Sequence, residues 1–204
     1  MGEFKSASEE ENIVFLDIET TPLPTSDDEV VLEYLMDKNI NRKFHPLFSK
    51  IILVGLKPKN KKSKLFYGDD ESKILLDLWE YLNKSQPDLI VSFNGYRFDV
   101  PFLYIRSLLN GVKPSFPINT NKNGMGRSNH FDCMLVLSHN DVFPWVSLEI
   151  ACRMFNIEIP QCEVKGSQIR ECYKNGKWEG IIKKCEADLT MLEKLYNKIS
   201  NGLM

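Results

Sequence analysis

The sequence predicts an α/β fold in which a central mixed sheet of about five strands is flanked by helices. Apolar, β-branched runs at 13–18, 51–57 and 64–68 have the composition of strands. Apolar residues at helical spacing follow at 75–82, and another apolar run leads into a second helical segment within 88–110. A succession of strands and helices of this kind is typical of a sheet covered by helices.

The order of these elements gives part of the topology. A basic, proline-containing turn at 58–63 separates the runs at 51–57 and 64–68, so we expect a hairpin. The first three strands are then antiparallel to their neighbours. A buried strand at 88–95 follows, and a helix from about 98 to 110.

The second half of the chain is predicted to be mainly helical. After a loop rich in Asn, Gly and Pro at 114–129, helical patterns return at 147–155 and from about 177 to 200. We find no internal repeat, and we expect 13–204 to form a single domain. Residues 1–12 are polar and acidic, as in a disordered lead or a tag remnant.

The segment between the first two strands, at about 23–48, is too long for a tight hairpin. It begins with acidic residues and carries Val31, Leu32 and Leu35 on one side, which indicates a helix. We expect an inserted helical segment that lies as a lid beside the acidic end of the first strand.

Composition narrows the class of protein. No apolar run approaches the roughly 18 residues that cross a bilayer, and no signal-peptide core is visible, so we expect a soluble, cytoplasmic protein. The net charge of -2 gives no global reason to bind nucleic acid, although a bound metal can reverse a local field. Five cysteines without a C-x-x-C pair argue against a disulfide framework and a zinc knuckle.

The first strand ends in an acidic pair, Asp17 and Glu19. Alternate residues of a strand share a face, so both carboxylates point the same way. Like charges placed side by side repel each other, and a cation would neutralise them. This pair therefore predicts a site for a hard divalent metal.

Two further acids stand in informative positions. Asp99 follows an Asn-Gly turn and starts a helix, where it either joins the site or caps the helix. Asp188 adjoins the apolar side of the last helix, where an unpaired acid is costly.

The segments VFLDIETT, SFNGYRFDVPFL and KKCEADLTMLEKLY, which carry these acids, resemble in order and context the three motifs of the DEDD superfamily of ribonuclease-H-like exonucleases. The chain is most similar to the exonuclease domain of family B DNA polymerases and to related free-standing proteins, over roughly 13–200. The resemblance implies a ribonuclease-H-like fold and 3′-5′ exonuclease activity on single-stranded DNA or RNA ends.

The resemblance also implies two divalent cations, Mg²⁺ or Mn²⁺. Asp17 would bridge both ions, Glu19 and Asp188 would complete the site of the water-activating ion, and Asp99 would hold the second. Two metals about 4 Å apart stabilise the charge that develops in phosphodiester hydrolysis. Because the same chemistry serves endonucleases, a ribonuclease-H-like endonuclease remains an alternative, as does a catalytically weak nucleic-acid-binding module.

The chain departs from the family at Lys184. The families carry a Tyr four residues before the last Asp, or a His five before it, and this chain has Lys184 and Lys183 there. A charged ammonium has no acceptor, so it cannot take a proton from water. Lys184 could donate to the scissile phosphate instead, or it could be an ordinary helix lysine facing solvent.

Five residues match positions that touch substrate in related exonucleases or could contact phosphate. The candidates are Thr20, Asn94, Arg97, Phe98 and Arg106. Each has a simpler alternative: Thr20 as a strand terminator, Asn94 as a turn former, Phe98 as a core residue and Arg106 as cover for its helix.

Two other residues beside these motifs have both a functional and a structural interpretation. Asp132, close to His130, is either a fifth acid at the cleft edge or a helix cap, and we favour the cap. Cys185 could have a lowered thiol pKa beside Lys184, although a buried structural role is favoured.

Overall fold

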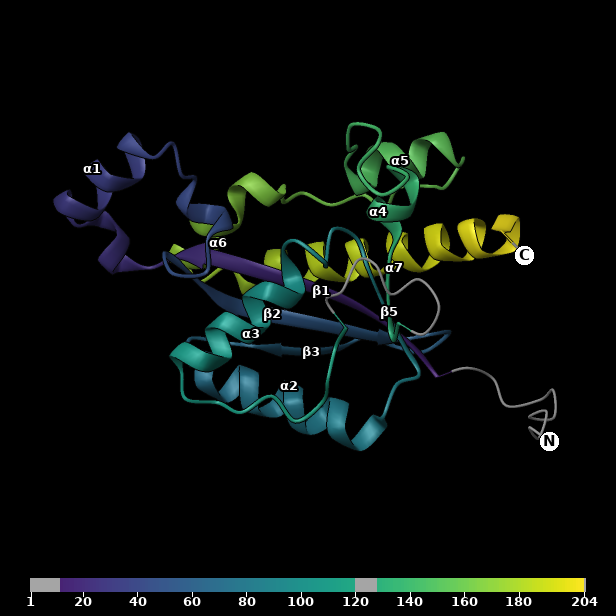
Figure 1. Cartoon of the computed structure of the whole chain (residues 1–204), viewed down its shortest axis with the longest axis horizontal. Helices are drawn as coiled ribbons and strands as arrows, with labels where there is room; N and C mark the ends of the chain where they lie inside the picture. Colours follow the sequence, from purple (N-terminus) through teal and green to yellow (C-terminus); the bar gives the residue numbers. More distant parts are fainter. Residues whose placement is uncertain (1–11, 120–127, 204) are drawn as a thin grey trace.

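A computed structural model describes residues 12–119 and 128–203 (Figure 1). The strands are β1 (Ile13–Pro22), β2 (Ser49–Pro58), β3 (Lys64–Tyr67), β4 (Leu89–Ser92) and β5 (His130–Asp132). The α-helices are α1 (Glu29–Asp37), α2 (Glu71–Ser85), α3 (Asp99–Leu109), α4 (Cys133–Leu137), α5 (Leu148–Met154), α6 (Ile169–Lys174) and α7 (Trp178–Leu203). Short 3₁₀ turns are η1 (Pro24–Asp27), η2 (Arg42–Phe44) and η3 (Gly166–Gln168). The expected lead, 1–12, lies outside the described residues except for Asn12.

The five strands form one mixed sheet in the order β3-β2-β1-β4-β5. β1 pairs antiparallel with β2, and β2 pairs antiparallel with β3, as predicted. β4 runs parallel to β1, and β5 runs parallel to β4. The predicted mixed sheet of about five strands is therefore confirmed.

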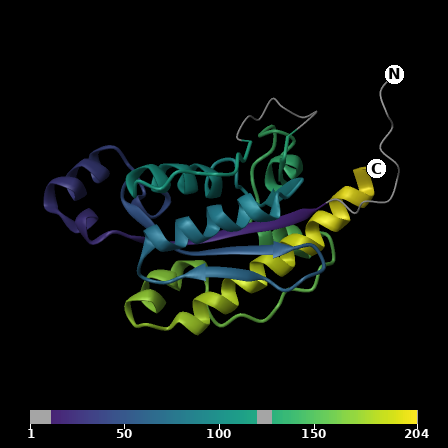
Figure 2. The same cartoon turned by 90° about the horizontal axis from the view of Figure 1, so that it is seen from below.

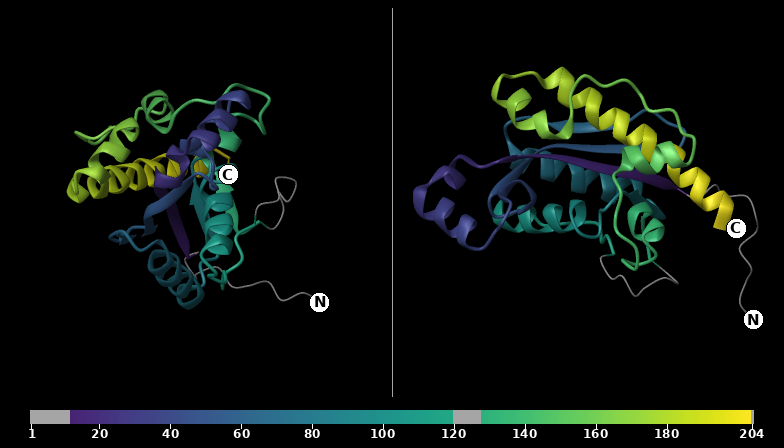
Figure 3. Two further views of the ribbon diagram at one scale, coloured as in Figure 1. Left: turned by 90° about the vertical axis from the view of Figure 1, so that its left-hand side faces the viewer. Right: turned by 90° about the horizontal axis from the view of Figure 1, so that it is seen from above.

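Helices cover both faces of the sheet. Alternate residues of β1 point to opposite sides: Val14 and Leu16 pack with α2 and α3, whereas Ile13 and Phe15 pack with α5, α6 and α7. Figure 2 shows α2 and α7 on opposite sides of the strands, and Figure 3 shows β1 running between α7 and the α2–α3 layer. Strand alternation thus assigns each β1 side chain to one of two cores.

One long helix passes very close to the sheet at Gly55 of β2. A Cβ added there would meet the Cys185 Sγ atom at 2.4 Å and a Leu189 methyl group at 2.8 Å. The missing side chain therefore allows α7 to approach the centre of the sheet.

The segment at 23–48 is an insertion between paired strand ends. Pro22 of β1 pairs with Ser49 of β2, and the Leu23 amide donates to the Phe48 carbonyl at 2.9 Å. The expected helix is α1, which Asp28 caps through the amides of residues 30 and 31. α1 lies at the end of the molecule opposite the end of α7 (Figure 1).

Arg106 is not an exposed residue of its helix. It is 7% exposed, and its guanidinium makes two hydrogen bonds to the Glu71 carboxylate, of 2.9 and 2.6 Å. Glu71 also accepts the Ile51 amide at 2.7 Å, and the Pro46 carbonyl accepts from Arg106 at 3.0 Å. The interpretations of Arg106 as a phosphate contact or a surface cover are corrected: it is one half of a buried ion pair that ties α3 to α2 and β2.

Two shorter elements were not predicted. β5 has three residues and α6 has six, so neither carries a full period of apolar residues. Among the described residues, no helix is long and apolar enough to span a membrane.

We predict that Arg106→Met lowers the free energy of unfolding by about 3–5 kcal/mol, because the substitution leaves the Glu71 carboxylate buried without its partner. Urea denaturation measures the change. The double variant Glu71→Met/Arg106→Met should recover much of the loss. Arg153→Met, which breaks an exposed ion pair with Glu149, is the control and should change stability little. A fully stable Arg106→Met protein would contradict this assignment.

Candidate active site

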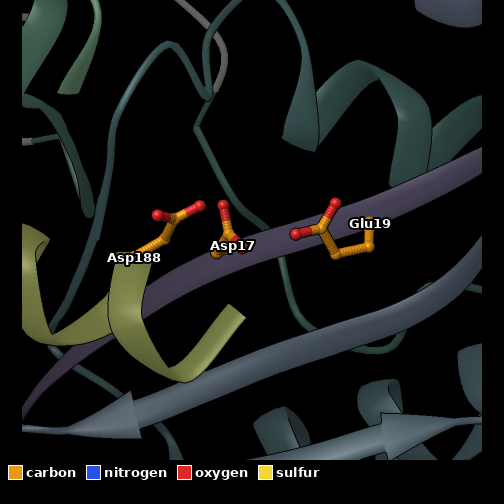
Figure 4. Close-up of side chains that lie close together, drawn as sticks. All are labelled: Asp17, Glu19 and Asp188. Atoms are coloured by element: carbon orange, nitrogen blue, oxygen red, sulfur yellow. The ribbon is translucent and has the colours of Figure 1, made fainter. Parts of the chain in front are cut away.

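The acidic pair of β1 points toward α7. Asp17 and Glu19 follow Ile13 and Phe15 in the strand alternation, so they share the face that α7 covers. Asp188 of α7 meets them there, and one carboxylate oxygen from each of the three lies within 4.8 Å of the others. Figure 4 shows the three side chains together, two from the strand and one from the helix.

Asp99 reaches the same place from the other side of β1. β4 pairs only with Ile13–Phe15, so the rest of that edge of β1 has no neighbouring strand. The Asp99 carboxylate fills this place and accepts the Ile18 amide at 3.2 Å. The alternative of Asp99 as a helix cap is wrong, because α3 begins at Asp99 itself and the cap position belongs to Phe98.

These acids share an unfavourable environment. Burial, and then the charges of Asp188, Glu19 and Asp99, raise the pKa of Asp17 well above its ordinary range. Burial raises the pKa of Glu19 to about 8 and that of Asp99 to about 7. Burial also raises the pKa of Asp188, although Lys184 opposes that shift. The carboxylates hold protons tightly because positive charge near them is insufficient.

The donor set fits a hard divalent cation. Every candidate ligand is a carboxylate oxygen, which Mg²⁺ and Mn²⁺ prefer. The Oδ2 atom of Asp17 is buried and has no hydrogen-bond partner among the described residues. A buried oxygen of this kind costs free energy unless a cation or donor meets it.

Lys184 is part of the acid cluster rather than of the solvent-facing surface. Its ammonium forms an ion pair with Asp188, one helical turn further along α7. Burial alone would lower the pKa of Lys184, but the carboxylates of Asp188, Glu19 and Asp17 outweigh it and raise the pKa. Lys184 is therefore a charged donor within the site, and the alternative of an ordinary surface lysine is wrong.

The neighbouring Cys185 is buried beneath the acids. Burial, and then the charges of Asp17 and Glu19, raise the pKa of its thiol well above the ordinary value. The suggestion of a lowered thiol pKa is wrong, and the thiol packs against Gly55 as a structural group.

Asp132 organises the loop that precedes Asp99. It caps α4 by accepting the amides of Met134 at 3.0 Å and Leu135 at 3.3 Å. It also accepts the amides of Asn94 at 2.8 Å and Tyr96 at 3.1 Å. The favoured capping role is confirmed, and Asp132 additionally fixes the backbone of the turn.

Three substrate candidates have clear surroundings. Asn94 adopts the left-handed φ of 70° that suits a turn former, and its side-chain oxygen is buried without a partner among the described residues. Phe98 packs on Phe102 at 4.7 Å between ring centroids and on Phe44 of the insertion at 6.0 Å. Thr20 comes directly after a register shift in β1, between Glu19 and Thr20.

Arg97 has partners of its own. Its guanidinium forms an ion pair with Asp141, and its Cζ atom lies 3.9 Å from the centroid of the Trp145 ring. As positioned, Arg97 holds the loop between α4 and α5 rather than an open phosphate site.

A groove of about 1060 Å³ opens beside the acids, between α5, the segment at 157–166 and α7. Lys184 and Asp188 line it on one side and Glu149 on the other. The charge of Glu149 adds to the raised pKa of Asp188. Sequence reasoning missed Glu149, because the three motifs do not include it and only the packing of α5 on α7 brings it close.

Comparison with known proteins identifies relatives. A family described as predicted 3′-5′ exonucleases related to the exonuclease domain of PolB matches residues 64–199. This range contains Asp99 and Asp188 but begins after Asp17 and Glu19.

Two related proteins match part of the chain. The catalytic polypeptide of DNA polymerase epsilon from Dictyostelium discoideum is 29% identical over 146 residues, which are 66% of this chain and 6% of that protein. The uncharacterized protein MJ0365 of Methanocaldococcus jannaschii is 26% identical over 138 residues, which are 67% of this chain and 73% of that protein. The chain thus spans only a small fraction of the polymerase.

A solved structure confirms the predicted fold. The family B DNA polymerase of Pyrobaculum calidifontis superposes with a TM-score of 0.70 at 16% identity, over 96% of this chain and 25% of the polymerase. The ribonuclease-H-like fold is therefore confirmed, and so is the relationship to DEDD exonucleases. With residues 64–199 matched to its model, the chain belongs to the family of predicted 3′-5′ exonucleases related to the exonuclease domain of PolB.

Proposed function

We propose that the protein is a metal-dependent 3′-5′ exonuclease that hydrolyses phosphodiester bonds at single-stranded nucleic-acid ends. The observation that carries the proposal is the meeting of Asp17, Glu19 and Asp188 within 4.8 Å, with Asp99 bonded to the amide between the first two. Four carboxylates at one point are costly in a protein that binds no cation.

The four acids would hold two divalent cations, Mg²⁺ or Mn²⁺. Bound there, the cations would supply an activated water and neutralise charge on the attacking and leaving oxygens. Asp17, with its partnerless buried oxygen, is the natural bridging ligand. The Ile18 amide orients Asp99, and α7 fixes Asp188 opposite the strand.

Lys184 would act on the substrate rather than on the water. Its raised pKa keeps it charged, so it has three donors and no acceptor. An ammonium at this position would donate to a non-bridging oxygen of the scissile phosphate and stabilise the transition state. Glu149, across the groove, offers an acceptor that Lys184 lacks.

A second candidate function has one specific observation in its favour. The ion pair between Lys184 and Asp188 engages one metal ligand with an internal cation. A protein in which this pair persists would bind nucleic acid with little turnover. Parallel assays of binding and of degradation separate this module from an enzyme.

The function is tested with 5′-labelled single-stranded DNA and RNA of one sequence, in Mg²⁺ and in Mn²⁺, beside a circular single-stranded DNA. We expect stepwise shortening of the linear strands from the 3′ end and no cut in the circle. Opening of the circle would identify the endonuclease alternative instead. Binding without degradation would identify the weak binding module.

We predict that Asp17→Asn and Asp188→Asn each lower metal-dependent degradation at least about 100-fold, because each removes a ligand and its charge from the site. Rates on the labelled DNA strand measure the loss. Asp77→Asn is the matched control, since Asp77 is an exposed acid of α2 paired with Lys73. Equal rates for the parent and Asp17→Asn would exclude the proposed chemistry.

The metal-free protein should become less stable as pH rises through the neutral range. The unfolded chain releases the Glu19 proton near the ordinary pKa of 4.5, whereas the folded chain releases it near 8. Between these values the folded state binds more protons, so the free energy of unfolding falls with rising pH. Thermal melts in chelator at pH 5 to 8 measure the slope.

Glu19→Gln should flatten that slope, raise the melting temperature at pH 8 in chelator and reduce the stabilisation by added Mn²⁺. Glu80→Gln, in an exposed pair with Lys84, is the control and should leave both properties unchanged. A slope in Glu19→Gln as steep as that of the parent would show that another group is responsible.

We predict that Lys184→Met is about 100-fold slower than the parent, because it removes a donor to the phosphate. Lys184→Tyr should be no faster than the parent if the ammonium supplies the main assistance at this position. Single-turnover rates measure both. Lys183→Met controls for loss of charge, since Lys183 is exposed and paired with Glu179. A faster Lys184→Tyr protein would show that the missing Tyr limits the rate.

A further inference from the structure

The loop between α4 and α5 holds a tryptophan in a fixed position (Figure 1). The Cζ atom of Arg97 lies 3.9 Å from the centroid of the Trp145 ring. The indole N–H of Trp145 donates to Oδ1 of Asp141 at 3.2 Å, and Oδ2 of Asp141 pairs with Arg97. One carboxylate therefore holds both the guanidinium and the indole, and we name these three residues the tryptophan shelf.

The backbone below the shelf is strained. His139, Asn140 and Asp141 have φ values of 49°, 56° and 73°, three successive left-handed residues without a glycine. Such conformations cost free energy, and they persist where the surroundings determine them strongly. The strain places the Asp141 carboxylate where it meets both partners.

The shelf is nevertheless open. Trp145 is 55% exposed although Arg97 covers one side of its ring. A single exposed apolar residue needs no explanation. An exposed indole fixed by a hydrogen bond and a cation–π contact is different, because its ordering cost has been met before any ligand arrives.

The shelf also adjoins the acid cluster. Arg97 precedes Asp99 by two residues, in the turn that Asp132 organises. On the other side, Ser147 and Glu149 follow Trp145 closely and line the groove that contains Asp188. The indole thus stands between the segment that supplies one metal ligand and the groove that contains another.

We propose that Trp145, backed by Arg97 and held by Asp141, is a stacking platform for one nucleobase of a single-stranded substrate. The inference rests on the proposed function and adds to it a base-binding position that none of the three motifs contains. Every base has a π-face, so an aromatic platform binds bases without regard to sequence. A base must be unstacked to lie on it, which selects single strands over duplexes.

The charge of the shelf agrees with this ligand. A strand that approaches four carboxylates is repelled by them, and the Arg97 guanidinium is a cation close to the path. Arg97 thereby contributes through Trp145 and the local field rather than as a direct phosphate contact.

Binding to the Asp17→Asn protein, which should retain the strand uncut, tests the proposal. The probe is a labelled single-stranded oligonucleotide, and anisotropy gives the dissociation constant. Indole fluorescence gives a second readout, because Trp79 is 2% exposed and Trp178 packs against Tyr67 and Tyr173. We expect the oligonucleotide to quench the fluorescence of Trp145.

Added to Asp17→Asn, Trp145→Ala should weaken binding about 10-fold and abolish the quenching. Trp145→Phe should keep much of the affinity and controls for folding. Phe143→Ala is the matched control: Phe143 lies in the same loop, is 60% exposed, and has no ring contact among the described residues. Oligonucleotides with an abasic position, moved stepwise from the 3′ end, should show one position whose loss is not additive with Trp145→Ala.

The failures of this test are distinct. If Asp17→Asn binds the oligonucleotide and Trp145→Ala binds it equally well, the platform is excluded while the proposed function stands. If Phe143→Ala weakens binding as much as Trp145→Ala, a general apolar effect replaces the platform. If no variant binds single strands and the parent degrades none, both proposals are overturned.

Discussion

The repulsion among four buried carboxylates is the constraint on which the rest of the structure depends. Each acid has its pKa raised, first of all by burial, and a folded protein does not gather such groups without a compensating cation. The scaffold must therefore hold them against their mutual repulsion. A two-sided sheet does this well, because β1 is packed on both faces and cannot turn its acids to solvent without exposing its core.

Two local features let the acids meet. β4 is short, so the Ile18 amide has no strand partner and the Asp99 carboxylate takes that place. Gly55 has no side chain, so α7 lies close enough to the sheet to bring Asp188 opposite Asp17. An extra pair of ladder residues in β4, or a single methyl group on β2, would separate acids that are far apart in the sequence.

The three acidic segments and the main elements were readable from sequence because their signals are local. Strand alternation placed Asp17 and Glu19 on one face, and helical spacing placed Lys184 beside Asp188. Arg106 was misread because its partner Glu71 lies 35 residues away on another helix, and periodicity does not show which long side chain is buried. Glu149 and the tryptophan shelf were not found for the same reason. Their positions depend on the packing of α5 and on a strained turn, not on any spacing in the chain.

The features that the three motifs do not contain gather on one side of the acids. Lys184 stands where a Tyr is expected and lines the groove with Glu149, and the tryptophan shelf borders the same groove. The four acids themselves are all present. A site that keeps its acids but changes a group facing the substrate has kept the metal requirement while altering how a strand is held. Positive charge at Lys184 and Arg97, set against the acids on either side, lets an anionic strand approach a cluster that would otherwise repel it.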